Sequence, residues 1–334
     1  EKTARYLEEY ADFLECHLED WTVTTQGTLV PGVKKHYVRI LPADVNNPVP
    51  VEDPNAGRLT IANIEPGHQA TFPAKEVVDG GFLELVRYGI RDARDPTIVD
   101  SLRVVDKVLK VDTPLGPCWH RYNHDGYGQR WDGGSYEGWG KGRAWPLLTG
   151  ERGHYEIAAG RDPKQYIRAM ERFASTGGLL PEQIWDEPDN DDAHLHFGRP
   201  TGSAMPLMWA HGEYVKLLRS ARDGKVFDLI PEVAQRYIVD RSRCKKLEVW
   251  KPNRQVAAVR SGCTIRIQTT HAFRLHWSLD GWATVVDTPS VTTPLGIHYV
   301  DIDPAPGQKG QLRFTFRWDE GSRWEGRDYL VELR

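Results

Sequence analysis

The chain has 334 residues, of which 40% are hydrophobic and 27% are charged, and its formal net charge is −4 at pH 7. This length allows two domains and a sizeable core, and the weakly acidic balance gives no electrostatic attraction to nucleic acid or to an anionic membrane. No apolar run reaches the length of a membrane span. We therefore expect a globular protein that has neither nucleic acid nor a membrane as a partner.

Six segments in the first two thirds of the chain carry helical patterns. Apolar residues recur in them at the spacing that one buried helix face requires. At Asp95-Pro96 and at Asp162-Pro163, an acidic N-cap precedes a proline at the first helical position, and this order predicts a helix start. The expected helices are 2–19, 74–88, the two that these dipeptides open, 143–159 and 204–219.

Long loops rich in Gly, Asn, Asp and Pro connect these helices. The segment 111–142 reads VDTPLGPCWHRYNHDGYGQRWDGGSYEGWGKG and combines Trp, Tyr, Arg and Asp with many glycines. Loops of this length on a helical scaffold tend to carry function. We expect this segment to line a polar pocket.

In the last third, the hydrophobic pattern changes to a period of two. Over 273–277 and 312–318, apolar residues alternate with polar or charged ones, as in strands with one buried face. Short strands of this kind, with turns between them, indicate an antiparallel β-sandwich. Because most of its aromatic residues fall on the apolar face, we expect this domain to brace its neighbour rather than to bind polysaccharide. The predicted division is 1–225 (helical), 226–245 (connector) and 246–334 (β-sandwich).

Several kinds of chemistry find no support in the sequence. His120 and His124 are four residues apart and His194 and His196 are two apart, but no third ligand stands at a diagnostic zinc spacing. The sequence has no GxSxG elbow and no phosphate-binding glycine motif. The acidic run 186–192 could bind calcium through carboxylate oxygens, although a solvated loop is the preferred interpretation. We expect no cofactor and leave a structural calcium ion open.

Carboxylate chemistry fits better. The stretch GGLLPEQIWDEPD at 177–189 places Glu182 close to Trp185. This glutamate could begin a helix, or it could work in a sugar-cleaving site, where two carboxyl groups are needed. Arg121 offers a forked set of donors that can grip sugar hydroxyls, and Asp125 follows in the same aromatic loop.

Four ordered motifs extend this interpretation. The segments RYNHDGYG (121–128), GRAWPLLTGERGHYE (142–156), LLPEQIWD (179–186) and TGSAMPLMWAHGEYVKL (201–217) resemble bacterial glucoamylases and glucodextranases, glycoside hydrolase family 15. The stretch LHWSLDGWATVVDT (275–288) resembles the domain that follows the barrel in glucodextranase. The resemblance runs over nearly the whole chain. It implies an (α/α)6 barrel of twelve helices and hydrolysis of α-glucosidic bonds with inversion.

The resemblance also implies roles for single residues. Glu182 matches the general base that activates water, and Ser203 matches a serine that supports it. Arg121 matches the arginine that binds sugar hydroxyls, and Asp125 is its acidic neighbour. Further candidates for substrate contact are Trp145 and Trp209, by motif, and Trp119, Tyr122 and Trp185, by neighbourhood. For the last three, packing beneath the pocket is an equal alternative.

The chain departs from the family pattern in one respect. The family's general acid, in a Trp-Glu-Glu segment, and the Arg-Asp motif that anchors the first sugar have no counterpart here. About six helices are half of twelve, so the chain resembles the C-terminal half of the barrel followed by its β-domain. Half a barrel would expose a large apolar face. We therefore expect a second polypeptide, made by proteolytic processing or from a separate gene, that carries the N-terminal half and the acid.

The expected function is that of a subunit of an inverting, exo-acting α-glucoside hydrolase that releases glucose from non-reducing ends. The alternatives are an α-glucosyl transferase or a trehalase of the same family, or a non-catalytic carbohydrate-binding subunit. The resemblance implies a secreted or periplasmic location. Linkage preference does not follow from these residues.

Overall fold

The computed structural model describes residues 2–42, 46–50, 53–242 and 246–334. Its residue contacts divide the chain into two compact units. The helical unit comprises Glu19–Leu41 and Glu52–Ser242, and the β unit comprises Glu1–Leu18, Pro42–Val51 and Arg243–Arg334. Within the described ranges, no helix is both long enough and apolar enough to cross a membrane.

This division differs from the ranges drawn from the sequence, because the first helix belongs mainly to the β unit. Helix α1 (Lys2–Thr22) places Tyr6 against the β unit, where its hydroxyl donates to Gln268 Oε1 at 2.9 Å. Arg266 Nη2 donates to Glu9 Oε2 at 2.6 Å. The expected connector is not separate either, since the helical unit continues to Ser242, and residues 243–245 lie outside the described part.

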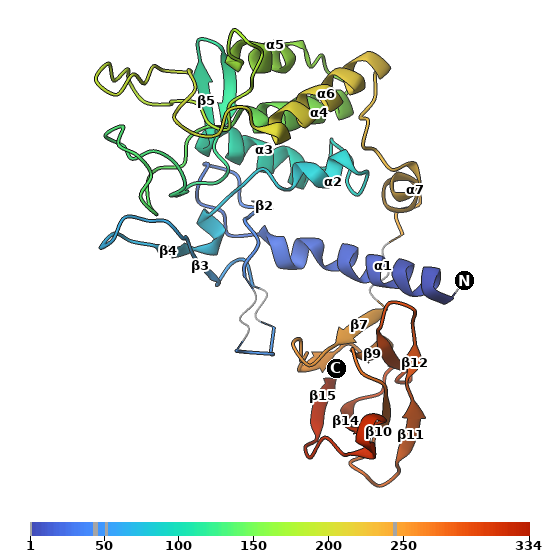
Figure 1. The fold of residues 1–334 in the computed structure, drawn as a ribbon. Helices are drawn as coiled ribbons and strands as arrows, with labels where there is room; N and C mark the ends of the chain where they lie inside the picture. Colours follow the sequence, from blue (N-terminus) through green and yellow to red (C-terminus); the bar gives the residue numbers. More distant parts are fainter. Residues whose placement is uncertain (1, 43–45, 51–52, 243–245) are drawn as a thin grey trace. The chain divides into compact units, whose positions relative to one another are not determined.

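Among the described residues, the helical unit holds six further α-helices, which Figure 1 labels. They are α2 (Leu83–Arg87), α3 (Pro96–Val108), α4 (Pro146–Ala158), α5 (Lys164–Phe173), α6 (Met208–Asp223) and α7 (Pro231–Ala234), and the one-turn π-helix Gln235–Val239 follows α7. Ile98, Leu102 and Val105 of α3 lie in the main core of this unit. The structure confirms the cap of α3, because Asp95 Oδ1 accepts a hydrogen bond from Thr97 N at 2.8 Å.

Two of the expected helix boundaries are wrong. The segment 74–88 contains only a 3-10 turn (Ala74–Glu76) and the short α2, because the paired glycines Gly80 and Gly81 interrupt it. Helix α6 runs over Met208–Asp223 and not over 204–219. At the start of α5, Asp162 Oδ1 accepts a hydrogen bond from Lys164 N at 3.0 Å, the same contact across two residues that caps α3.

Three short antiparallel hairpins complete the helical unit. They are β1 (Val23–Thr24) with β2 (His36–Tyr37), β3 (Arg58–Thr60) with β4 (Thr71–Pro73), and β5 (Lys110–Thr113) with β6 (Gly116–Trp119). The third hairpin lies in the segment expected to be a loop, and it leads the chain into the turns of 120–144.

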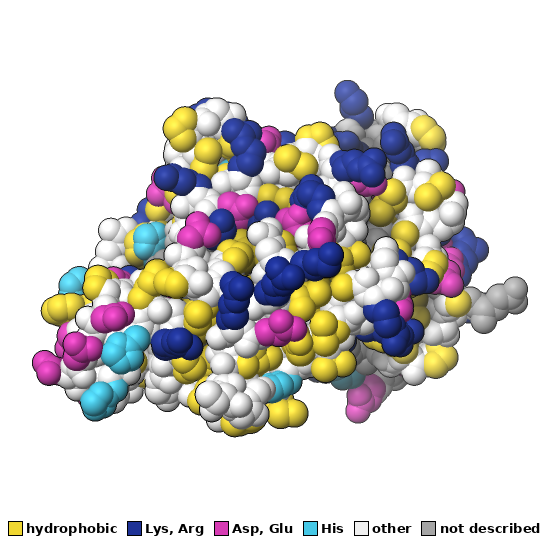
Figure 2. Space-filling view, turned by 90° about the horizontal axis from the view of Figure 1, so that it is seen from above, with side chains coloured by type: hydrophobic (Ala, Val, Ile, Leu, Met, Phe, Trp, Pro, Cys, Tyr) yellow, Lys and Arg dark blue, Asp and Glu magenta, His cyan; other side chains and the backbone are white. Residues whose placement is uncertain are grey.

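Helix α6 carries apolar side chains on two opposite faces. Ala210 and Leu217 on one face are fully buried, whereas Met208, Val215 and Leu218 on the other are 73%, 64% and 39% exposed. Figure 2 shows hydrophobic side chains among Lys and Arg side chains on the face of the molecule seen from above. Lys216, Arg219 and Arg222 belong to the same helix, so its exposed side carries charged and apolar side chains together.

The β unit contains two sheets that share one core. The strands are β7 (Leu247–Trp250), β8 (Ala258–Val259), β9 (Thr264–Thr269), β10 (Phe273–Ser278), β11 (Val286–Pro289), β12 (Val291–Thr292), β13 (His298–Ile302), β14 (Gly310–Trp318) and β15 (Tyr329–Leu333). Their orders are β11-β10-β14-β15-β8 and β12-β13-β9-β7. Trp250, Phe273 and Phe316 pack in this core. Most pairs are antiparallel, as expected, whereas β7 pairs with β9 and β15 with β8 in parallel.

Candidate active site

Glu182 lies in an extended segment, not at a helix start. Helix α5 ends at Phe173 and α6 begins at Met208. Between them, Ile184 forms β-bridges with Ala144 and Pro200, and Glu182 N donates to Ala204 O at 2.8 Å. Backbone pairing on both sides therefore fixes the position of this glutamate.

A backbone amide, that of Ala204, holds the Glu182 carboxylate. Its side chain is largely buried, with the residue 8% exposed, and Oε2 accepts a hydrogen bond from Ala204 N at 3.2 Å. Ser203 Oγ accepts from Gln183 N at 3.0 Å and from Thr201 Oγ1 at 2.9 Å. Ser203 thus supports the backbone beside Glu182 rather than the carboxylate itself.

An open pocket of about 310 Å³ lies in front of Glu182. Two groups of residues line it. The first comes from the aromatic segment 111–142: Tyr127, Gly128, Gln129, Ser135 and Tyr136. The second comes from the extended segment around Glu182 and from the residues that pair with it: Glu182, Gln183, Thr201, Gly202, Ser203 and Ala204. Burial raises the pKa of Tyr127, and the neighbouring Glu182 carboxylate raises it further. The Tyr127 phenol therefore keeps its proton at neutral pH and remains a donor in this pocket. The volume lies at the lower end of small-molecule sites, which span about 300–1,000 Å³.

A buried polar network connects the two segments that line the pocket. Gln183 Nε2 donates to Tyr127 O at 3.1 Å. Arg143 is fully buried, donates to Asp186 Oδ1 at 2.7 Å and lies with its guanidinium carbon 4.1 Å from the centre of a Trp185 ring. Sequence reasoning missed Arg143, Gln183 and Asp186. All three lie inside the quoted motifs, which was the only available signal, because the sequence does not show which charged side chains are buried.

Arg121 and Asp125 form a second ion pair next to the pocket, in which Asp125 is buried and Arg121 is partly exposed. Arg121 Nε and Nη2 donate to the two oxygens of Asp125 at 2.7 and 2.9 Å. Burial alone would lower the pKa of Arg121, but the pair with Asp125 raises it above its ordinary value. The guanidinium carbon lies 4.9 Å from the Tyr127 ring centre and 5.0 Å from that of Trp145. With its side chain 33% exposed, Arg121 keeps donors for a ligand.

The remaining aromatic candidates do not line the pocket. Trp119 is buried and donates to Asp106 Oδ1 at 3.0 Å, and Trp185 is buried and donates to Pro188 O at 2.8 Å. Both geometries agree with packing beneath the site. Trp209 is 72% exposed on α6.

Tyr122 and Trp145 lie around Arg121. The Arg121 guanidinium carbon is 5.4 Å from the centre of the Tyr122 ring, and the Arg39 guanidinium carbon is 3.9 Å from the same centre. Trp145 immediately precedes α4, and its indole Nε1 is buried with no acceptor among the described residues. Of these two residues, Trp145 has the polar group that a substrate hydroxyl could satisfy.

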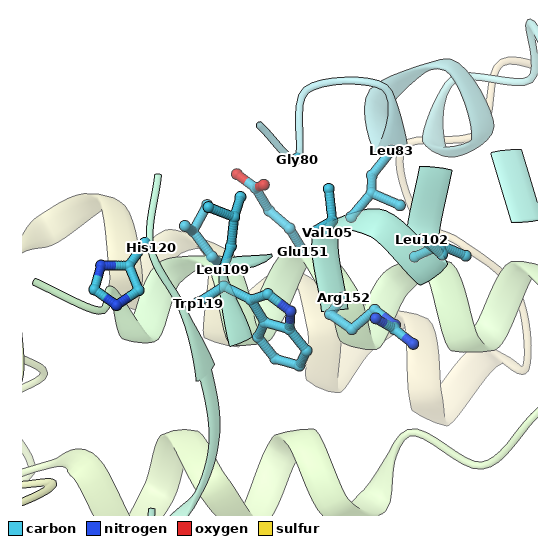
Figure 3. A pocket seen from close by; sticks show the side chains of 10 residues that line it. Gly80, Leu83, Leu102, Val105, Leu109, Trp119, His120, Glu151 and Arg152 are labelled. Atoms are coloured by element: carbon cyan, nitrogen blue, oxygen red, sulfur yellow. The ribbon is translucent and has the colours of Figure 1, made fainter. Parts of the chain in front are cut away.

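A second cavity in the helical unit is much smaller, about 20 Å³, and is lined mainly by apolar side chains including Leu83, Leu102 and Val105. Figure 3 shows the Glu151 carboxyl pointing toward Gly80 at its edge. Burial raises the pKa of Glu151 to about 8. The space holds about one water molecule, so this cavity is not a sugar site.

The histidines and the acidic run have contacts of other kinds. His120 Nε2 lies 3.2 Å from Asp186 Oδ2, and the His124 ring stacks on Phe72. Asp189 accepts a hydrogen bond from Phe197 N at 2.7 Å. Across the part of the chain that the structure describes, no three His, Cys, Asp or Glu side chains come together as a metal site. A structural calcium ion stays a prediction.

Comparison with known proteins adds a family. Residues 2–219 match the family model described as glycosyl hydrolases family 15. A glucoamylase of Clostridium sp. (strain G0005) is 46% identical over 238 residues, which are 71% of this chain and 31% of that protein. The crystal structure of a bacterial glucoamylase complexed with acarbose matches with a TM-score of 0.62 and 45% identity, over 71% of this chain and 32% of that one.

A more distant match is a cycloisomaltooligosaccharide glucanotransferase of Niallia circulans. It is 25% identical over 138 residues, which are 37% of this chain and 14% of that protein. The chain therefore spans less than a third of the length of the curated proteins that it matches.

Proposed function

Because the chain belongs to glycosyl hydrolase family 15, we propose that it is part of an enzyme that hydrolyses α-glucosidic bonds and releases glucose from non-reducing ends. The observation that carries the proposal is Glu182, a carboxylate fixed by backbone pairing at the wall of an open pocket. The resemblance to proteins named glucoamylase supports the choice of substrate class.

We propose Glu182 as the general base of an inverting reaction. Ala204 N holds Oε2, and the other oxygen would take a proton from a water molecule in the pocket. That water would attack the anomeric carbon on the face opposite to the departing oxygen, and the released glucose would have the inverted configuration. Tyr127 would donate a hydrogen bond within the pocket, and Arg121, held by Asp125, would orient hydroxyls of the sugar.

The reaction needs a second carboxyl group that protonates the leaving oxygen, about 6.5–9.5 Å from the base. The nearby carboxylates Asp125 and Asp186 are bound to Arg121 and Arg143, so neither suits that role. We propose that the acid lies outside these 334 residues, in the N-terminal half of an (α/α)6 barrel.

The exposed apolar residues of α6 support a missing half. Met208 and Val215, which are 73% and 64% exposed, would each gain roughly 1–2 kcal/mol when another helix covers them. Denaturing electrophoresis of the native, purified enzyme shows whether the two halves lie on one polypeptide or on two. Full activity of the 38.0 kDa chain alone would refute the missing acid.

Replacing Glu182 with glutamine tests the base. In the complete enzyme, we expect kcat on maltose to fall by about 10²–10⁴-fold, the usual contribution of a positioned acid or base, while acarbose binding by calorimetry persists. Glu187→Gln, the same change five residues further along in a side chain 31% exposed, is the matched control and should keep near-normal kcat. Similar kcat values for the two variants would exclude Glu182 as the base.

Transfer of a glucosyl unit to another sugar is a second candidate, because two matching proteins are named cycloisomaltooligosaccharide glucanotransferase. Product analysis with maltose, isomaltose and trehalose separates hydrolysis, transfer and trehalose cleavage. For location, we propose secretion or the periplasm, and fractionation of cells that express the native gene provides the test.

A further inference from the structure

Three aromatic rings lie together on the outer side of the five-stranded sheet. They belong to His276 on β10, Trp282 in the turn after β10, and Trp324 after the 3-10 turn Glu320–Ser322. Ring centres of His276 and Trp282 are 5.4 Å apart with planes at 29°, and those of His276 and Trp324 are 5.3 Å apart with planes at 83°. Trp324 remains 53% exposed. We call these three residues the aromatic platform.

Strand alternation explains why the platform faces outward. Leu275, the neighbour of His276 on β10, is fully buried in the core of the β unit, together with Phe314 and Phe316 of β14. Successive side chains of a strand point to opposite faces, so His276 lies on the outer face. The expectation that aromatics of this domain serve packing holds for the core rings, but the platform is a separate group.

The platform is held in a strained and well-supported geometry. Trp282 has φ = 73°, a left-handed conformation that is unusual for a bulky side chain. Ser278 Oγ accepts a hydrogen bond from Trp282 N at 2.9 Å, and Asp280 accepts from Thr284 Oγ1 at 2.6 Å. The Trp282 indole donates to Asp328 Oδ2 at 3.2 Å. Strain that the surroundings maintain in this way clusters at ligand sites.

The polar groups around the rings favour a neutral, hydroxyl-rich ligand. His276 Nδ1 lies 2.9 Å from Asp287 Oδ1, and Asp328 holds Trp282. A carboxylate has about four acceptor positions, so each of these two acids can also accept hydrogen bonds from a ligand. The exposed ring of Trp324 offers an apolar face for the C–H side of a pyranose.

We propose that the aromatic platform is an auxiliary binding site for an α-glucan chain, separate from the Glu182 pocket. The choice of an α-glucan rests on the proposed function.

Affinity electrophoresis in native gels that contain amylopectin or dextran tests the platform with the whole chain. We expect the polysaccharide to retard wild type and Trp324→Ala to raise the dissociation constant about tenfold, as the loss of one aromatic contact implies. Trp131→Ala removes a Trp that is 70% exposed in the helical unit and is the matched control, with retardation like that of wild type. Trp282→Phe keeps a ring but loses the bond to Asp328, so it should weaken binding without removing the platform.

Equal retardation of Trp324→Ala and wild type would overturn the proposal, and so would the absence of retardation of wild type in both gels. If circular dichroism shows that Trp324→Ala is unfolded, Trp282→Phe decides by the same criterion. The gels measure binding and not turnover. An active Glu182→Gln variant would therefore refute the proposed base and leave the outcome for the platform unchanged.

Discussion

Replacing Arg143 with methionine would remove the centre of the buried network behind the pocket. Asp186, whose side chain is 1% exposed, would lose its guanidinium partner, and breaking such a buried pair costs about 3–5 kcal/mol. The carbonyls of Gln129 and Arg130 would also lose their donor. His120, 3.2 Å from Asp186, can offset part of this loss. We therefore expect a total loss of about 3–5 kcal/mol in the free energy of unfolding.

Urea denaturation followed by far-UV circular dichroism measures this loss. Arg103→Met is the matched control, since Arg103 pairs with Asp100 at 3.0 Å while both side chains are well exposed, and it should cost no more than about 1 kcal/mol. Combining Arg143→Met with Asp186→Asn should cost less than the sum of the two single changes, because the second change removes the stranded charge. Equal losses for the two Arg variants, or strict additivity in the double variant, would refute the reasoning.

Two more changes test other parts of the helical unit. Burial raises the pKa of Glu151 from 4.5 to about 8, so the folded state binds a proton that the unfolded chain releases. The free energy of unfolding should therefore fall as pH rises from about 4.5 to about 8. Glu151→Gln should remove this part of the fall, measured as Tm at each pH. Parallel Tm–pH curves for wild type and the variant would contradict this explanation. Gly116→Ala would bring a Cβ within 2.4 Å of Ala169 Cβ at φ = 138°, costing about 2–6 kcal/mol in urea. Gly224→Ala, at φ = 68° in open space, should cost only about 1–2 kcal/mol, and equal losses would refute the packing argument.

Local signals in the sequence predicted the elements that local chemistry determines. Asp95-Pro96 marks the start of α3 because the cap contact with Thr97 spans only two residues. The expected helix 74–88 failed where the glycine pair outweighs an apolar pattern. The position of Glu182 could be predicted from its motif, but its extended backbone could not, because the pairing partner Ala204 comes 22 residues later.

Burial of charge was harder to predict than the motif itself. Arg143 looks like an ordinary surface cation in the sequence, and only the tertiary structure shows that it is fully buried against Asp186, 43 residues away. Trp185 looks equally suited to sugar stacking and to packing, and the structure places it under the Arg143 guanidinium. Such distinctions depend on contacts between distant segments, which periodicity does not encode.

The membership of α1 in the β unit has a consequence for synthesis of the chain. Tyr6 and Phe13 on this helix are almost fully buried, yet Gln268, which binds Tyr6, follows 262 residues later. At about 5–20 residues per second, a ribosome needs roughly 13–52 s to cover that distance. During this interval Tyr6 lacks Gln268, so the nascent chain presents an aromatic side chain of α1 that a chaperone can hold until strand β9 emerges.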